Sequence, residues 1–403
     1  MTAATGSALA RAYLDYNATA SARAEAREAA LAAMETTGNP SSVHAEGRAA
    51  RRIVEAARRE IAQLAGVSAR CVTFVSGGTE AANSALNPLF GGGLNAAPLE
   101  RLIVSAGEHP CVLSGHRFPV AETAPLRADG CVDLDWLEAA CRHPGRVLLA
   151  LQGANNETGV IQPVAEAAAL VHAAHGFVFC DAVQMAGRAP SDIAALGADA
   201  VMLSAHKMGG LKGAGALVVA RAGLSLGAPL IRGGGQERGA RAGTESVAAI
   251  AAFGAAARLC LADLATEPAR LTAMRERLTG AVRSVAADAV IFAEAAPRLP
   301  NTLCFAVPGV EAATLMIALD LGGVAVSSGS ACSSGKVAPS HVLAAMGVAP
   351  ALARGAIRLS LGWASTEADV GRFAQAFASV IARMRAARRG VSALRAEPAA
   401  ARG

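Results

Sequence analysis

Residues 200–219 read AVMLSAHKMGGLKGAGALVV, and this stretch decides the fold class. Two apolar runs, Ala200–Leu203 and Ala216–Val219, flank a polar and glycine-rich turn that contains Lys207. Apolar runs without alternation are typical of strands that helices cover on both faces. We therefore expect two strands of a buried sheet, with Lys207 just beyond the end of the first one.

The sequence before this stretch repeats the pattern. Further runs of the same kind lie at Val72–Val75, Leu102–Val104, Val147–Leu151 and Phe177–Cys180. Helical periodicity is clearest over Glu46 to Leu64, where apolar side chains form one stripe. Strands that alternate with helices predict an α/β layer fold with a mostly parallel sheet. Leu303–Ala306 and Ile357–Leu361 are expected to be strands of a smaller α+β domain.

Bulk properties restrict the class of protein. The 403 residues suffice for two domains, and the formal net charge of +5 is spread along the chain rather than gathered into a nucleic-acid-binding surface. The most apolar run, Val247 to Ala257, is too short to span a membrane and predicts a buried helix. Nothing in Met1 to Arg11 resembles an export signal. We expect a cytoplasmic protein that binds neither nucleic acid nor a membrane.

The eight cysteines show neither a Cys-x-x-Cys pair nor the spacing of a zinc site, so no metal is expected. Most of them lie among apolar residues, as inert buried thiols do. Cys332 differs, because small and polar residues surround it from Ser327 to Lys336. Such a segment predicts a mobile, exposed loop. Taken alone, a spare cysteine in a linker and a nucleophilic thiol explain Cys332 equally well.

Polar residues follow the ends of many predicted strands, where ligands bind in open α/β sheets. They are Gly78 with Thr79, His109, Asn156, Asp181 with Gln184, and Ser204 with His206 and Lys207. Lysine occurs at three positions in the whole chain, and a Schiff base requires a primary amine that arginine cannot supply. The set suits pyridoxal phosphate, which needs such a lysine, an acid such as Asp181 at the pyridinium nitrogen, phosphate donors and a flat neighbour. Singly, each has an ordinary explanation: Asp181 as a helix N-cap, His109 as a structural histidine.

Seven motifs in order give the chain a family resemblance. They are YLDYNAT (13–19), GNPSSVH (38–44), EHP (108–110), ANNETG (154–159), GGGQERG (233–239), RAGT (241–244) and SSGSAC (327–332). This ordered set resembles the cysteine desulfurases of the nitrogen-fixation and iron–sulfur-assembly type, across nearly the whole chain. The resemblance implies the pyridoxal-phosphate-dependent transferase fold (aspartate-aminotransferase-like), in its class V aminotransferase version.

The resemblance also implies roles for particular residues. Lys207 would hold pyridoxal 5'-phosphate, Asp181 would face the pyridinium nitrogen and His109 would stack on the ring and act as acid or base. The remaining cofactor contacts would come from Gly78, Thr79, Asn156, Gln184, Ser204 and His206, and from Thr244 of a second subunit in a homodimer. Arg358 and Asn156 would bind the carboxylate of L-cysteine. Cys332 would take the sulfur as a persulfide and pass it to an acceptor, either an iron–sulfur scaffold or a sulfurtransferase.

Four departures from the family pattern, at Ala20, Ala205, Leu211 and Ser333, remove no catalytic group. A selenocysteine lyase, another class V aminotransferase and a catalytically silent sulfur-transfer partner remain alternatives. We expect a large cofactor-binding domain over residues 17–262. Residues 1–16 and 263–388 are expected to form the small domain with the Cys332 loop, and residues 389–403 a disordered tail.

Overall fold

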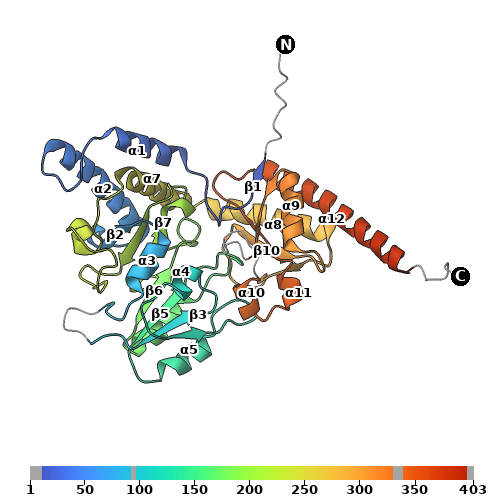
Figure 1. The fold of residues 1–403 in the computed structure, drawn as a ribbon, viewed down its shortest axis with the longest axis horizontal. Helices are drawn as coiled ribbons and strands as arrows, with labels where there is room; N and C mark the ends of the chain where they lie inside the picture. The colour runs from blue at the N-terminus through green and yellow to red at the C-terminus, as the bar shows by residue number, and fades with distance from the viewer. Residues whose placement is uncertain (1–10, 92–96, 330–338, 397–403) are drawn as a thin grey trace, which may run out of the picture.

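The computed structural model describes residues 11–91, 97–329 and 339–396. A seven-stranded sheet forms its centre, in the order β2-β8-β7-β6-β5-β3-β4 (Figure 1). The strands from β4 to β7 run parallel, whereas β8 is antiparallel to both of its neighbours. These strands are β2 (Val72–Val75), β3 (Arg101–Ser105), β4 (Ala121–Ala124), β5 (Val147–Gln152), β6 (Phe177–Asp181), β7 (Ala200–Ser204) and β8 (Gly215–Val219). The predicted mostly parallel α/β sheet is confirmed.

Helices cover both faces of this sheet, which explains why its strands show no alternation of polar and apolar residues. In β5, Leu149 packs into one apolar cluster while its neighbours Leu148 and Ala150 pack into the cluster on the opposite face. One face is covered by α1 (Ala24–Glu35), α2 (Ala45–Leu64), α5 (Leu134–Cys141), α6 (Val164–Ala173) and α7 (Val247–Asp263). The other face is covered by α3 (Gly78–Ala85) and α4 (Pro110–Leu113).

A second apolar core lies in the C-terminal part of the chain. Its four-stranded antiparallel sheet has the order β12-β13-β10-β9, and β1 pairs with β11 in parallel. The strands are β1 (Ala12–Tyr13), β9 (Val290–Ile291), β10 (Thr302–Ala306), β11 (Val324–Ala325), β12 (Ser327–Ser328) and β13 (Ile357–Ser360). Its helices are α8 (Glu267–Val285), α9 (Ala312–Leu321) and α12 (Glu367–Ala396), whereas the short α10 (His341–Ala345) and α11 (Pro350–Ala353) pack into the first core. The division at residues 16 and 262 remains our proposal, because Cys304 and Val342 pack into the first core.

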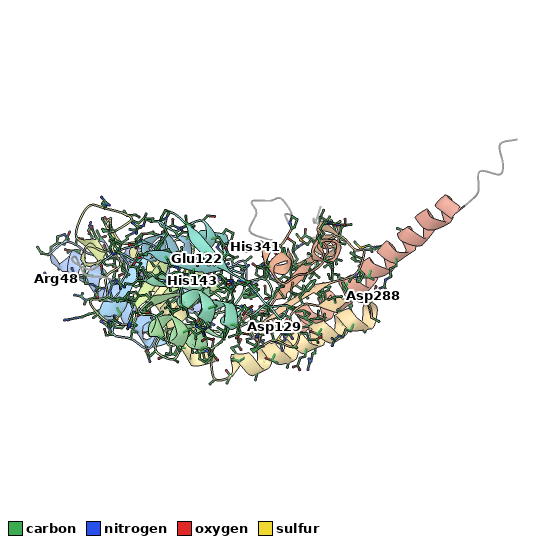
Figure 2. All side chains as sticks on the ribbon, turned by 90° about the horizontal axis from the view of Figure 1, so that it is seen from below. Arg48, Glu122, Asp129, His143, Asp288 and His341 are labelled. Atoms are coloured by element: carbon green, nitrogen blue, oxygen red, sulfur yellow. The ribbon has the colours of Figure 1, made fainter. Side chains whose placement is uncertain are left out.

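The end of the chain differs from the sequence-based expectation. Helix α12 continues to Ala396, so residues 389–396 are helical rather than disordered, and residues 397–403 lie outside the described part. Alanine and arginine have high helix propensities, which this expectation underrated. Figure 2 shows the helix projecting from the body beyond Asp288, whose carboxylate accepts a 2.6 Å hydrogen bond from Arg385.

Within the described ranges, no single helix is long and apolar enough to cross a membrane. Helices α7 and α8, which meet at a bend of 79°, reach that length and composition only as a pair.

Candidate active site

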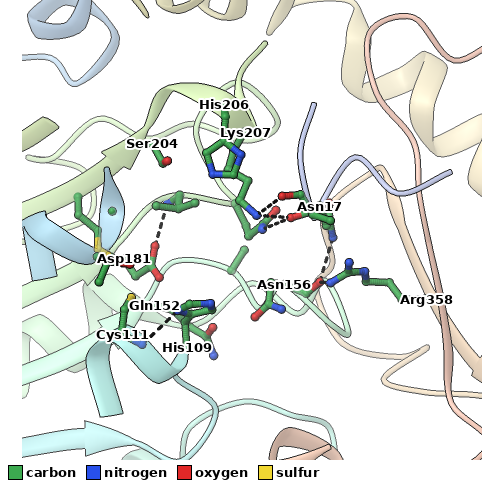
Figure 3. A pocket seen from close by; sticks show the side chains of 17 residues that line it. Asn17, His109, Cys111, Gln152, Asn156, Asp181, Ser204, His206, Lys207 and Arg358 are labelled. Atoms are coloured by element: carbon green, nitrogen blue, oxygen red, sulfur yellow. Dashed lines mark hydrogen bonds between the residues drawn. The ribbon is translucent and has the colours of Figure 1, made fainter. Parts of the chain in front are cut away.

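A cavity of about 310 Å³ lies at the carboxyl ends of β6 and β7, between the two cores (Figure 3). The predicted residues that line it are Gly78, Thr79, His109, Asn156, Asp181, Gln184, Ser204, His206, Lys207 and Arg358. Most of them follow strands of the parallel sheet, so that the shared direction of these strands brings their ends to one edge. Arg358 comes from β13 of the second core and closes the opposite side.

Lys207 ends a 3-10 turn, Ala205–Lys207, that directly follows β7. Its Nζ donates hydrogen bonds to the carbonyl oxygens of Asn17, at 2.6 Å, and Ala18, at 2.7 Å (Figure 3). The side chain is half-buried and lines the cavity. The amine therefore lies where a bound aldehyde could meet it.

Asp181 is the last residue of β6 and is buried. Its Oδ1 accepts a 2.9 Å hydrogen bond from the Val183 backbone, which fixes the carboxylate at the start of the following turn. Burial raises the pKa of Asp181 to about 6, against the lowering effects of that hydrogen bond and of Lys207. A cation placed against this carboxylate would be stabilised strongly, because little water screens it.

His109 caps the N-terminus of α4, with its Nδ1 accepting a 3.2 Å hydrogen bond from the backbone of Cys111. Burial, and then the positive charges of Lys207 and His341, lower the pKa of His109 to about 4. The imidazole is thus neutral at physiological pH, and its Nδ1 is committed to the cap. With Nδ1 accepting, the proton of the neutral ring is on Nε2, so the imidazole can donate from Nε2 or lie against a flat ring.

Donors for an anion gather at the other end of the cavity. Helix α3 begins at Gly78, so its first backbone N–H groups and the Thr79 side chain lie at a positive helix end. Ser204 ends β7, and the His206 ring bonds the Thr19 hydroxyl at 3.1 Å. Together, an amine, a buried carboxylate and a helix N-terminus with hydroxyls form the set of groups that pyridoxal phosphate requires. The residues present therefore fit this cofactor.

Arg358 and Asn156 form the remaining wall. The Arg358 guanidinium is 1 % exposed and donates from Nη1 to the Asn156 carbonyl at 3.0 Å. From Nη2 it donates to Asp15 Oδ1 at 2.8 Å. Its Nε is buried and has no hydrogen-bond partner among the described residues. A carboxylate is the natural ligand for a guanidinium at a cavity wall.

Two predicted residues are not brought into this cavity. Thr244 is exposed and borders a separate small cavity with Ser76 and Arg241. Cys332 lies outside the described residues. Both assignments therefore stay predictions.

Among the residues that line the cavity, sequence reasoning gave no role to three with an amide or thiol side chain: Asn17, Cys111 and Gln152. Asn17 stands within the YLDYNAT motif, so its position there was the available signal. Its side chain joins both cores through Thr302 Oγ1, at 2.9 Å, and the Asn156 carbonyl, at 3.1 Å. Cys111 and Gln152 gave no such signal, because only the fold brings them beside Asp181 and His109.

Comparisons with known proteins agree with this geometry. The family described as "Aminotransferase class-V" matches residues 12–373. An IscS-like cysteine desulfurase of Mycobacterium tuberculosis is 39% identical over 385 residues, 93% of this chain and 98% of that protein. A cysteine desulfurase of Cereibacter sphaeroides is 39% identical over 93% of this chain and 97% of its own length. The crystal structure of a NifS-like protein from Rickettsia africae superposes with a TM-score of 0.82 at 32% identity, over 92% of this chain and 99% of that chain.

Proposed function

We propose roles for these residues on the basis of one finding, which is that the chain belongs to the aminotransferase class-V family. It is a pyridoxal-phosphate-dependent cysteine desulfurase, converting L-cysteine to L-alanine and supplying sulfur for iron–sulfur cluster assembly or a related transfer. One observation carries the proposal. A primary amine, a buried carboxylate, a neutral imidazole and a buried guanidinium line a single cavity.

Pyridoxal phosphate, when bound, supplies an electron sink that weakens the bonds at the substrate α-carbon. Lys207 would hold the cofactor through Nζ, and its amine would serve as the base for the substrate α-proton. Asp181 would face the ring nitrogen, and the first turn of α3 with Ser204 and His206 would bind the phosphate. The neutral imidazole of His109 accepts at Nδ1 from Cys111, so its proton is on Nε2, from which it would donate to a group in the cavity.

Arg358 and Asn156 orient L-cysteine by its carboxylate. The Cys332 thiolate attacks the substrate sulfur, so that a sulfur–sulfur bond forms as the carbon–sulfur bond breaks. The electron pair of the broken bond stays with the substrate, whose β-carbon takes up one proton and becomes the methyl group of alanine. In sum, L-cysteine and the Cys332 thiol become L-alanine and a Cys332 persulfide, with no external oxidant. An iron–sulfur scaffold or sulfurtransferase then accepts the sulfur.

The enzyme works as a cytoplasmic homodimer in this proposal. The homodimer is supported by the position of Thr244, which is exposed and does not line the Lys207 cavity of its own chain. Arg241 ties the segment that carries Thr244 to helix α3 through a 2.9 Å ion pair with Glu80. Thr244 would thereby be held ready for the phosphate in the second subunit. Light scattering tests the dimer, and a monomeric holoenzyme would contradict it.

The function is tested by measuring sulfide and alanine released from L-cysteine with a reductant. Wild type should give equal amounts of both products, and Cys332→Ala should lose them. The matched control is Cys141→Ala, a half-exposed thiol on α5, remote from the cavity, which should keep full activity.

Cys111 is the competing sulfur acceptor, since it lines the cavity. Burial raises the pKa of its thiol, so it stays protonated at neutral pH and is a poor nucleophile. Activity that survives in Cys332→Ala but disappears in Cys111→Ala would reassign the nucleophile. A cofactor-loaded wild type that releases no sulfide would contradict the proposed function.

A further inference from the structure

Residues 15–18 connect the two ends of the cavity. The carbonyls of Asn17 and Ala18 accept hydrogen bonds from Lys207, as described above. The Asn17 side chain donates to the same Asn156 carbonyl that accepts from Arg358 Nη1 (Figure 3). Two residues earlier, Asp15 forms the ion pair with Arg358. One short segment of the chain thus contacts the lysine of the site through its carbonyls and the arginine through a carboxylate.

The backbone fixes Asp15 beside Arg358. Asp15 pairs with Ser360 in a parallel bridge, and Ser360 is two residues beyond Arg358 on β13. The Ser360 N–H donates to the Leu14 carbonyl at 2.8 Å, and the Tyr16 N–H donates to the Ser360 carbonyl at 3.2 Å. The bridge therefore places the Asp15 carboxylate and the Arg358 guanidinium side by side.

The guanidinium presents three kinds of donor, and the protein uses two of them. Nη1 bonds the Asn156 carbonyl and Nη2 bonds Asp15, whereas Nε is buried and has no partner in the described part of the chain. Arg358 lines the cavity, but Asp15 does not. Asp15 therefore binds the guanidinium from outside the cavity lining and leaves the cavity itself clear for a ligand carboxylate.

We infer that Asp15 is a positioning residue, which holds the Arg358 guanidinium at the cavity wall for the substrate carboxylate. This inference rests on the proposed function, in which Arg358 binds that carboxylate. A guanidinium that is 1 % exposed needs an opposite charge. Asp15 provides the one ion pair of Arg358 within 4.0 Å among the described residues. Glu157 is also nearby, but its carboxylate bonds the Ser340 hydroxyl.

The test compares Asp15→Asn with wild type in the cofactor-loaded enzyme. Asparagine keeps the shape and one acceptor oxygen but removes the charge. The KM for L-cysteine should rise about tenfold, as expected for one charged hydrogen bond, while kcat changes less. A second readout needs no turnover: the dissociation constant of L-alanine, from the absorbance of the bound cofactor, should rise by a similar factor. Ethylamine, which is alanine without its carboxylate, should bind both proteins equally.

Two further variants make the result specific. Asp263→Asn is the matched control, because Asp263 also binds a mostly buried arginine, Arg23, through one oxygen at 2.7 Å. It should leave alanine binding unchanged. In an Arg358→Gln background, Asp15→Asn should have little further effect, which a general structural defect would not produce.

The outcomes separate two failures. Unchanged alanine binding in Asp15→Asn, with weakened binding in Arg358→Gln, overturns the role of Asp15 and leaves the function standing. Absence of sulfide from wild type overturns the function instead. If Asp15→Asn does not fold, Asp15→Glu supplies the comparison. It keeps the charge but shifts it by one methylene, and alanine binding equal to that of wild type would overturn the positioning role.

Discussion

The buried ion pair between Arg58 of α2 and Glu237 allows a sharp prediction about stability. Their side chains are 3% and 1% exposed, and two 2.7 Å hydrogen bonds join them. Glu237 also accepts a 2.8 Å hydrogen bond from the Phe74 backbone. Burial lowers the pKa of Arg58, but the hydrogen bonds and charge of Glu237 raise it on balance. When Glu237 is replaced, the guanidinium still stays charged, because an arginine loses its proton only far above neutral pH.

Replacing Glu237 with glutamine should cost about 3 kcal/mol of unfolding free energy. Removal of one partner from a buried ion pair costs about 3 to 5 kcal/mol, because the other charge is left uncompensated. Glu55 lies 3.2 Å from Arg58 Nε but is 37% exposed, so it offsets part of that loss. The lower end of the range is thus the reasonable value. The backbone of Glu237 is also strained, with a φ of 48°. The ion pair with Arg58 holds this strained turn, from which the chain continues to Arg241 and Thr244.

Urea denaturation followed by tryptophan fluorescence measures the effect in the apo and the cofactor-loaded protein. Glu138→Gln is the control, because Glu138 is half-exposed and pairs with Arg142 one helical turn away. Its cost should stay below about 0.5 kcal/mol. If Glu237→Gln costs no more than this control, the buried pair does not stabilise the fold as argued.

Three more predictions concern the site and its supports. Asp181→Asn should weaken cofactor binding by at least about tenfold, measured by equilibrium dialysis, because the buried countercharge of the pyridinium is lost; equal affinity would contradict its role. Burial raises the pKa of Glu157 to about 7, against the lowering effects of Ser340 and Arg358. Between about pH 4.5 and 7, Glu157 is therefore protonated in the folded apoprotein but ionised in the unfolded chain. The unfolding free energy of the apoprotein should fall as pH rises through that window, by about 3 kcal/mol at most, and Glu157→Gln should flatten the slope. Gly362→Ala should destabilise by about 1 to 3 kcal/mol, because a Cβ there would lie 1.9 Å from the Tyr16 ring, whereas Gly371→Ala, with open space around it, should not lower the melting temperature.

The fold was predictable where one physical cause acts along the sequence. Continuous apolar runs such as Val147–Leu151 indicate strands covered on both faces, and the structure shows two clusters sharing each strand. The reversed direction of β8 was not predicted, although residues 205–214, which join it to β7, are too few for a parallel crossover. The helical end of α12 was also missed: composition suggested disorder, but helix propensity favoured continuation.

Only part of the candidate site could be predicted from the sequence. Residues at strand ends, such as Asp181 and Lys207, converge because parallel strands end at one edge. Cys111 and Gln152 could not be assigned, since they reach the cavity through the packing of neighbouring strands rather than through a motif. Asp15 is intermediate, because its motif was visible but its partner, Arg358, is 343 residues away. No periodicity links such a pair, and only the parallel bridge between Asp15 and Ser360 brings it together.

This long-range bridge explains how a substrate site between two cores can keep a fixed geometry. Arg358 belongs to the second core and Lys207 to the first, so their separation depends on how the cores dock. Residues 14–17 hydrogen-bond to Ser360 on one side, and the carbonyls of Asn17 and Ala18 accept from Lys207 on the other. The Asn17 side chain adds bonds to Thr302 and to the Asn156 carbonyl. A carboxylate clamp and an amine on separate cores are thereby held at a fixed spacing, which precise orientation of a small amino acid requires.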